Sequence, residues 1–138
     1  MLKAEFYDFI SKRDLYNIVS SLPTPTYIYF LKIIEKRFND LKNCLPAPFK
    51  IHYALKANPH TQIVAKMCNL GAGADVASEG EIKIALSSGI PPEHIEFSGP
   101  GKKEKELAYA ILNEIGSINI ESIAELEIIA SLCSKLHK

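Results

Sequence analysis

The sequence predicts an α/β fold in which helices cover a parallel sheet. Two observations support this expectation: four short apolar runs are each followed by a helical stretch, and residues that cap helices stand at the boundaries between them. The runs cover residues 49–55, 73–77, 95–98 and 117–120, and their starts lie about two dozen residues apart. Successive strand–helix units of this kind form parallel strands joined by right-handed crossovers.

Two helices are expected before the first of these runs. Residues 1–22 indicate a short helical lead-in. A second helix is expected after the extended segment 27–29, because four apolar residues recur there at helical spacing: Leu31, Ile34, Phe38 and Leu41.

The later helices are marked at both ends. Asn58 and Pro59 indicate an N-cap followed by proline at the first helical position. Segments 78–81 and 122–125 both match the capping box, in which a serine and a glutamate satisfy each other's free backbone amides. Three glycines are expected where helices end: Gly71, Gly89 and Gly116.

The composition is typical of a globular protein in a reducing compartment. Sixteen basic residues balance sixteen acidic ones, which argues against a general attraction to nucleic acid or to an anionic membrane. The apolar runs are too short to span a bilayer, and the first residues lack the apolar core of a secretory signal. Cys44, Cys68 and Cys133 lie far apart and indicate neither a disulfide framework nor a metal site. These features favour a cytoplasmic location.

The first predicted strand carries the candidate catalytic residue, Lys56. Alternation along the strand directs one set of side chains toward the helices: Phe49, Ile51, Tyr53 and Leu55. The opposite set is Lys50, His52, Ala54 and Lys56. In a β/α barrel this second face points inward, and active sites form at the carboxyl ends of the strands. A partly desolvated amine there is a nucleophile for an aldehyde, whereas the plainer interpretation is a lysine that extends into solvent from a strand end.

Polar residues gather at the same ends of the neighbouring strands. Asp75 shares its face with Ala77 and is expected beside Lys56, Ser98 ends the third strand, and Glu121 follows the fourth. Ser78 and Ser122 are expected to act mainly as helix caps. His52 shares the inward face but is expected deeper, as a hydrogen-bonded core residue rather than a catalyst.

Two glycine-rich segments do not fit nucleotide-binding motifs. Residues 99–102 lack the earlier glycine of a phosphate-binding loop, because Glu96 occupies that position. Residues 71–73 precede a strand instead of following one, so they do not match a dinucleotide-binding turn.

The strand–helix pattern fits two arrangements, a doubly wound sheet and a β/α barrel. Four units make half of an eight-stranded barrel, which usually needs about 250 residues. The 138 residues therefore form either a complete small α/β protein or part of a larger one, and we favour the second.

Several segments resemble a known family. Residues 53–58, Tyr-Ala-Leu-Lys-Ala-Asn, are similar to the cofactor-lysine motif of the barrel-type pyridoxal-phosphate-dependent decarboxylases that act on diaminopimelate, ornithine and arginine. The resemblance runs in order over residues 24–136. Its other segments are 24–29, 73–81, 97–102 and 118–122.

The resemblance implies a partial (β/α)8 barrel and a specific set of site residues. Lys56 would form a Schiff base with pyridoxal phosphate and assist proton transfer, while Asp75 and Ala54 would lie in the cofactor pocket, Ala54 beside the ring. Residues 1–22 would be the helical lead-in, and residues 23–138 the N-terminal portion of the cofactor-binding barrel. The family's glycine-rich phosphate loop, its acid for the pyridinium nitrogen and its second, β-rich domain come later in the chain. The full-length form would be a homodimer with a small amino-acid substrate, and this portion alone is expected to be inactive.

Three functional alternatives remain open at this stage. The chain is a portion of a decarboxylase, a non-catalytic regulatory or binding module derived from one, or a racemase-like or cofactor-carrier barrel. The motifs at 75–78 and 98–102 speak against the racemase, and the retained Lys56 favours the decarboxylase. Among substrates, diaminopimelate is the first expectation, with ornithine, arginine, carboxynorspermidine and carrier-bound amino acids as alternatives.

Overall fold

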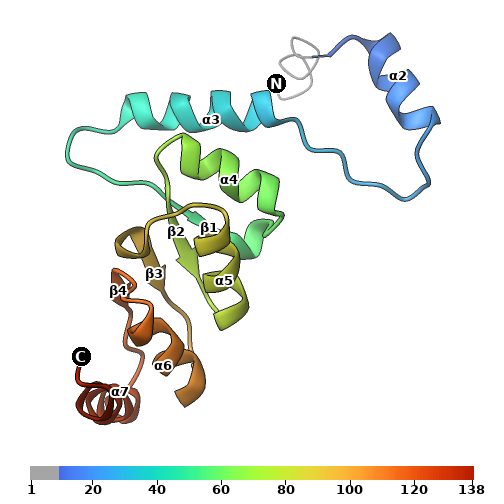
Figure 1. Cartoon of the computed structure of the whole chain (residues 1–138). Coiled ribbons are helices and arrows are strands. Elements are labelled where there is room, and N and C mark those ends of the chain that lie inside the picture. The colour runs from blue at the N-terminus through green and yellow to red at the C-terminus, as the bar shows by residue number, and fades with distance from the viewer. Residues whose placement is uncertain (1–9) are drawn as a thin grey trace. The chain divides into compact units, whose positions relative to one another are not determined.

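The computed structural model describes residues 10–138 (Figure 1). The chain divides into two compact units, with the boundary between Leu45 and Pro46. The described residues of the first unit form two helices, and the second unit contains a four-stranded sheet with its covering helices.

The described part of the first unit consists of α2 (Lys12–Ser20) and α3 (Leu31–Cys44). Ser11 caps α2 by accepting a hydrogen bond from the backbone amide of Asp14 at 3.1 Å. A helix is therefore present within the described part of the predicted lead-in 1–22, whose residues 1–9 lie outside the described residues, and the helix expected after residues 27–29 is present as α3. Of the predicted apolar stripe on α3, only Phe38 is buried.

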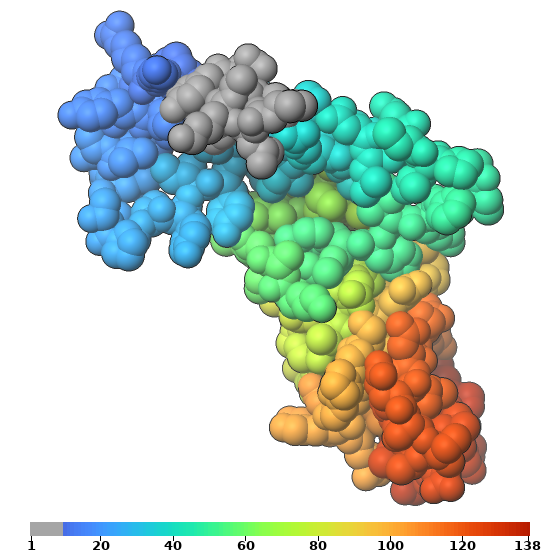
Figure 2. Space-filling view, turned by 180° about the vertical axis from the view of Figure 1, so that it is seen from behind, coloured from blue at the N-terminus to red at the C-terminus, as the bar shows by residue number. Residues whose placement is uncertain are grey.

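The sheet of the second unit is parallel throughout. Its strands are β1 (His52–Ala54), β2 (Gly73–Val76), β3 (Ile95–Phe97) and β4 (Ser117–Ile118), paired in the order β1-β2-β3-β4. Each strand lies next to its predecessor in the chain, so the order never reverses as it does in a doubly wound sheet. In the space-filling view, the colours of the second unit follow one another in chain order, from green through yellow and orange to red (Figure 2). This topology is that of a partial (β/α)8 barrel and confirms the expected fold class.

Helices and two short 3-10 turns connect the strands. The helices are α4 (Thr61–Asn69), α5 (Glu79–Ser87), α6 (Glu104–Leu112) and α7 (Ile123–Leu136), and the turns are η1 (Leu55–Ala57) and η2 (Pro92–His94). The strand side chains that face the helices are fully or almost fully buried: Ala74, Val76, Ile95 and Phe97. They form one core with helix residues such as Val64, Ile82 and Leu107.

The first and last strands are shorter than expected. The run 49–55 yields only three strand residues, since Leu55 enters the 3-10 turn and Phe49 is 68% exposed. The run 117–120 yields two, and Ile120 is exposed. β1 and β4 each pair on one side only, so fewer hydrogen bonds hold their ends in extended conformation.

The two serine caps are confirmed, but the glutamate of each capping box accepts from a different backbone amide than expected. Ser78 accepts from the amide of Glu81 at 3.2 Å, and Ser122 accepts from that of Glu125 at 3.1 Å. Each glutamate, however, reaches one residue beyond the capping serine. The carboxylates of Glu81 and Glu125 accept from the amides of Ala77 at 2.7 Å and Glu121 at 3.0 Å, so they tie the strand ends to the helices.

The predicted start of α4 at Asn58 and Pro59 is wrong. His60 caps this helix, its Nδ1 accepting from the amide of Gln62 at 3.3 Å. The side chain of Asn58 accepts instead from the amide of His60 at 3.0 Å. Asn58 therefore stabilises the turn before the helix, and Pro59 lies outside it.

Gly71 and Gly89 follow α4 and α5 with φ angles of 90° and 92°, as expected for helix ends. The prediction that Gly116 ends a helix is wrong, because the residue with left-handed backbone after α6 is Glu114, with a φ of 54°. Gly116 is needed for space: a Cβ there would collide with the carbonyl group of Glu93.

Candidate active site

The candidate site lies on the sheet face opposite the helices, at the carboxyl ends of the strands. The register pairs Ala54 with Asp75, Asp75 with Glu96, and Glu96 with Ser117, so these residues form one row across the sheet. Ala54, Asp75 and Glu96 are half-buried. The predicted alternation of faces is confirmed for β2 and β3, where the outward neighbours Ala74, Val76, Ile95 and Phe97 are buried beneath helices. It is not seen in the burial of β1, where the outward Tyr53 is half-buried like His52 and Ala54.

Lys56 stands in the 3-10 turn directly after β1 and is exposed. The turn is held on both sides, because the preceding Leu55 is completely buried and the Tyr53 hydroxyl donates to the carbonyl of Asn58 at 3.0 Å. Within residues 10–138 the Lys56 amine makes no hydrogen bond or ion pair. An anchored backbone thus carries an accessible amine that is not neutralised by a described carboxylate.

Asp75 lies on the adjacent strand and is bound from the next strand along. Its Oδ1 accepts a hydrogen bond from the hydroxyl of Ser98, the residue that follows β3. Asp75 forms no bond to Lys56. The structure therefore brings Asp75 together with Ser98 and places Ala54 beside Asp75 in register, with Lys56 two residues beyond Ala54.

Small residues leave space around these side chains. Ala54 and Ala77 contribute only methyl groups on the inward face. Gly99 has a φ of 94°, and a Cβ added there would lie 3.8 Å from that of Ala77. The loops after β2 and β3 therefore approach each other closely without a large side chain between them.

His52 occupies the same face one row below Ala54, as expected. Its Nδ1 is buried without a hydrogen bond and lies 3.8 Å from Oε1 of Glu96. Atoms of its ring would lie 2.8 Å and 2.9 Å from a Cβ at position 73, so Gly73 makes room for the imidazole. The predicted hydrogen bond of His52 is absent within the described residues, which leaves a histidine–glutamate contact below the rim of the site.

Lys102 and Glu125 form a buried ion pair that the sequence analysis missed. The Lys102 amine donates to Oε1 of Glu125 at 2.8 Å and to the carbonyl of Asn119 at 2.7 Å, with 1% of the lysine side chain exposed. It also lies 5.6 Å from the centre of the Phe97 ring. The pair links the loop after β3 to the start of α7.

The pKa of Glu125 shows which effect dominates in this pair. Burial by itself raises the pKa of a carboxyl group. Hydrogen bonds from Lys102 and from the Glu121 amide, together with the lysine charge, outweigh burial and lower the pKa of Glu125. One sequence signal could have revealed the pair: Glu125 falls on the core-facing side of its helix, where a carboxylate requires a partner.

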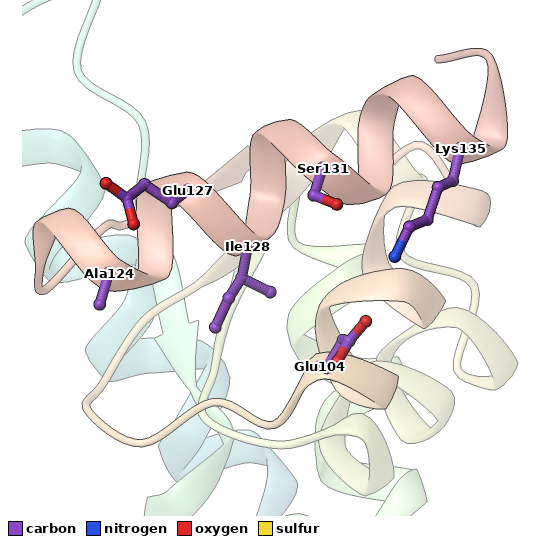
Figure 3. Close-up of a pocket in the computed structure, with 6 residues that line it drawn as sticks. All are labelled: Glu104, Ala124, Glu127, Ile128, Ser131 and Lys135. Atoms are coloured by element: carbon purple, nitrogen blue, oxygen red, sulfur yellow. The ribbon is translucent and has the colours of Figure 1, made fainter.

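A separate hollow of about 460 Å³ lies between α6 and α7. Its lining residues are Glu104, Ala124, Glu127, Ile128, Ser131 and Lys135 (Figure 3). All six come from these two helices and none from a strand end, so the hollow is distinct from the candidate active site. The part of the chain covered by the structure contains no cluster of metal-binding side chains and no helix long and apolar enough to cross a membrane.

The site's residues fit a pyridoxal cofactor: an accessible amine, small neighbours beside it and a carboxylate on the adjacent strand. Residues 31–138 match the family model described as the pyridoxal-binding domain of pyridoxal-dependent decarboxylases. The chain belongs to this family. The predicted family and its cofactor class are thereby confirmed.

Relatives in this decarboxylase family include several diaminopimelate decarboxylases. That of Aquifex aeolicus is 40% identical over 130 residues, which are 94% of this chain and 31% of the relative. The L-glutamyl-[BtrI acyl-carrier protein] decarboxylase of Niallia circulans is 33% identical over 129 residues, 94% of this chain and 30% of the relative. The chain thus spans about a third of the length of these decarboxylases.

Solved structures agree with the decarboxylase assignment. Helicobacter pylori diaminopimelate decarboxylase, in complex with L-lysine, superposes with a TM-score of 0.83 at 35% identity, covering 89% of this chain and 32% of that one. A structure from Aquifex aeolicus gives a TM-score of 0.86 at 40% identity, covering 90% and 31%.

Proposed function

We propose that this chain is the cofactor-holding portion of a pyridoxal-phosphate-dependent amino-acid decarboxylase, with Lys56 forming the Schiff base. The observation that carries the proposal is the accessible, unpaired Lys56 amine at the carboxyl end of β1, inside the region that matches the pyridoxal-binding family. Residues 23–138 would then belong to the barrel and residues 1–22 to a helical lead-in.

Each inward residue has a defined task in this proposal. When bound, pyridoxal phosphate supplies an electron sink for the carbanion that remains after loss of carbon dioxide. Lys56 would hold the cofactor covalently through its Nζ, and the same amine would carry the proton needed later in the reaction. Ala54 leaves room for the flat ring, and Asp75 provides a carboxylate on the neighbouring strand.

Diaminopimelate is the substrate that the relatives favour. The decarboxylases of Aquifex aeolicus and Helicobacter pylori are named for it, at 40% identity each. A carrier-bound amino acid is the second candidate, because the Niallia circulans relative acts on a glutamyl group attached to a carrier protein. The free cysteines among the described residues fit a cytoplasmic location. For the full-length enzyme we also propose a homodimer.

Cofactor trapping tests the role of Lys56. The purified chain is incubated with pyridoxal phosphate and reduced with borohydride, and the adduct is located by peptide mass mapping. We expect one adduct per chain, confined to Lys56. Lys56→Arg should abolish it, whereas the matched change Lys105→Arg on the exposed side of α6 should leave it intact. Adducts scattered over surface lysines would contradict the proposal.

A further inference from the structure

Ser98 lies where it can control the orientation of Asp75. The backbone amide of Ser98 donates to the carbonyl of Val76 at 2.8 Å, so the ladder between β2 and β3 continues one residue past the end of β3. Because side chains alternate along an extended strand, Ser98 faces the same side as Glu96 and Asp75. Its hydroxyl then reaches Oδ1 of Asp75 across the strand gap.

The hydrogen bond from Ser98 fixes only one of the two carboxylate oxygens of Asp75. Oδ1 is bound by Ser98, and Oδ2 has no partner among residues 10–138. A carboxylate can accept several hydrogen bonds, so Oδ2 retains its full capacity. A half-buried aspartate with one oxygen fixed presents the other in a defined direction, whereas without Ser98 the side chain would rotate about χ1 and χ2.

We propose that Ser98 is a positioning residue for the cofactor site, acting through Asp75. This inference rests on the proposed function and adds to it a residue that does not itself touch the cofactor. By fixing Asp75 Oδ1, Ser98 keeps Oδ2 available to a donor on the bound cofactor or on Lys56.

Three features show that the position of Ser98 is itself well determined. Its backbone is anchored by the bond to Val76, and Gly99 turns the chain immediately afterwards with its positive φ. Four residues later the Lys102 amine is fixed by Glu125 and Asn119. The loop after β3 is thus tied to the sheet at Ser98 and to β4 and α7 at Lys102, which limits the movement of the Ser98 hydroxyl.

A double-mutant cycle in the full chain tests the inference. The variants are Ser98→Ala, Asp75→Ala and the double variant, and the measured quantity is the dissociation constant of pyridoxal phosphate from its absorbance. Ser98→Ala should weaken binding about tenfold, the size expected when one hydrogen bond to a charged group is lost. In the Asp75→Ala background the same change should have almost no effect, because Ser98 would have nothing left to orient.

Three companion measurements separate positioning from a general effect on the fold. Ser98→Thr retains the hydroxyl and should restore binding. Ser87→Ala, which removes an exposed hydroxyl bound only within α5, should leave binding unchanged. In the absence of cofactor, three-bond NMR couplings should report a single χ1 rotamer for Asp75 in the unaltered chain and averaging in Ser98→Ala.

The outcomes distinguish failure of the inference from failure of the proposed function. If the unaltered chain takes up no cofactor at Lys56, both are overturned. If it does so and Ser98→Ala binds equally well, or weakens binding to the same extent with and without Asp75, only the positioning role is overturned.

Discussion

At the scale of single residues, the packing of the inward sheet face depends on a glycine, which has no side chain. Gly73 has no side chain because the His94 carbonyl and the His52 ring occupy that space. The sequence predicted helix ends at Gly71, Gly89 and Gly116 but did not predict this close approach at Gly73. Such contacts depend on the packing of neighbouring strands, so the local pattern around Gly73 contains no sign of them.

Gly73→Ala should therefore destabilise the fold. A Cβ would lie 2.5 Å from the His94 carbonyl oxygen, a backbone atom that cannot rotate away. We expect a loss of about 2–4 kcal/mol in the free energy of unfolding, measured by urea titration. Gly80→Ala is the matched control, because its nearest neighbour would be 3.8 Å away and the residue lies in α5. This control should be neutral or slightly stabilising; equal losses at both glycines would contradict the steric explanation.

At the scale of elements, the sequence predicted local features well and contacts between units poorly. Strand faces and serine caps follow from side chains a few residues apart. The Asp75–Ser98 and Lys102–Glu125 bonds each join residues 23 positions apart, about one strand–helix unit. Parallel pairing brings equivalent positions of successive units together, but the register that selects the partners emerges only in the folded sheet.

The Lys102–Glu125 pair should make the stability of the fold depend on pH in acid. The pKa of Glu125 in the folded state is lowered from 4.5. The stability that the ionised Glu125 adds to the fold is therefore present above pH 4.5 and is lost as the pH falls through the folded-state pKa. Glu125→Gln should therefore flatten the decline of stability with falling pH below about 4.5, measured by urea unfolding across pH. Lys102→Met should cost about 3–5 kcal/mol at neutral pH, because it leaves a buried carboxylate without its cation.

An exposed pair provides the control for this effect. Lys138 also binds Glu114 and lowers its pKa, but 69% of the Glu114 side chain is exposed and solvent screens the interaction. Glu114→Gln should change the pH profile much less than Glu125→Gln. A similar change in both variants would contradict a special role for the buried pair.

At the scale of the whole molecule, four parallel strands provide half of the strand ends that form an eight-stranded barrel site. The β/α rhythm predicted this class of fold, and the family resemblance selected the barrel. The present strand ends contribute the lysine and one carboxylate of the proposed site. The relatives are about three times as long, so binding of the phosphate and of the substrate would involve residues beyond the matched region.

We therefore expect the chain to take up pyridoxal phosphate at Lys56 without releasing carbon dioxide from diaminopimelate. The physical reason is that holding the cofactor requires an accessible amine, whereas turnover also requires a fixed ring, a bound phosphate and a site that orients the substrate carboxylate. Release of labelled carbon dioxide from carboxyl-labelled substrate measures this directly. Turnover by the pure chain that disappears in Lys56→Ala would contradict the expectation. Adding the part of the Aquifex aeolicus relative that lies outside the matched region should produce activity that depends on Lys56, because the two parts together correspond to the length of that relative.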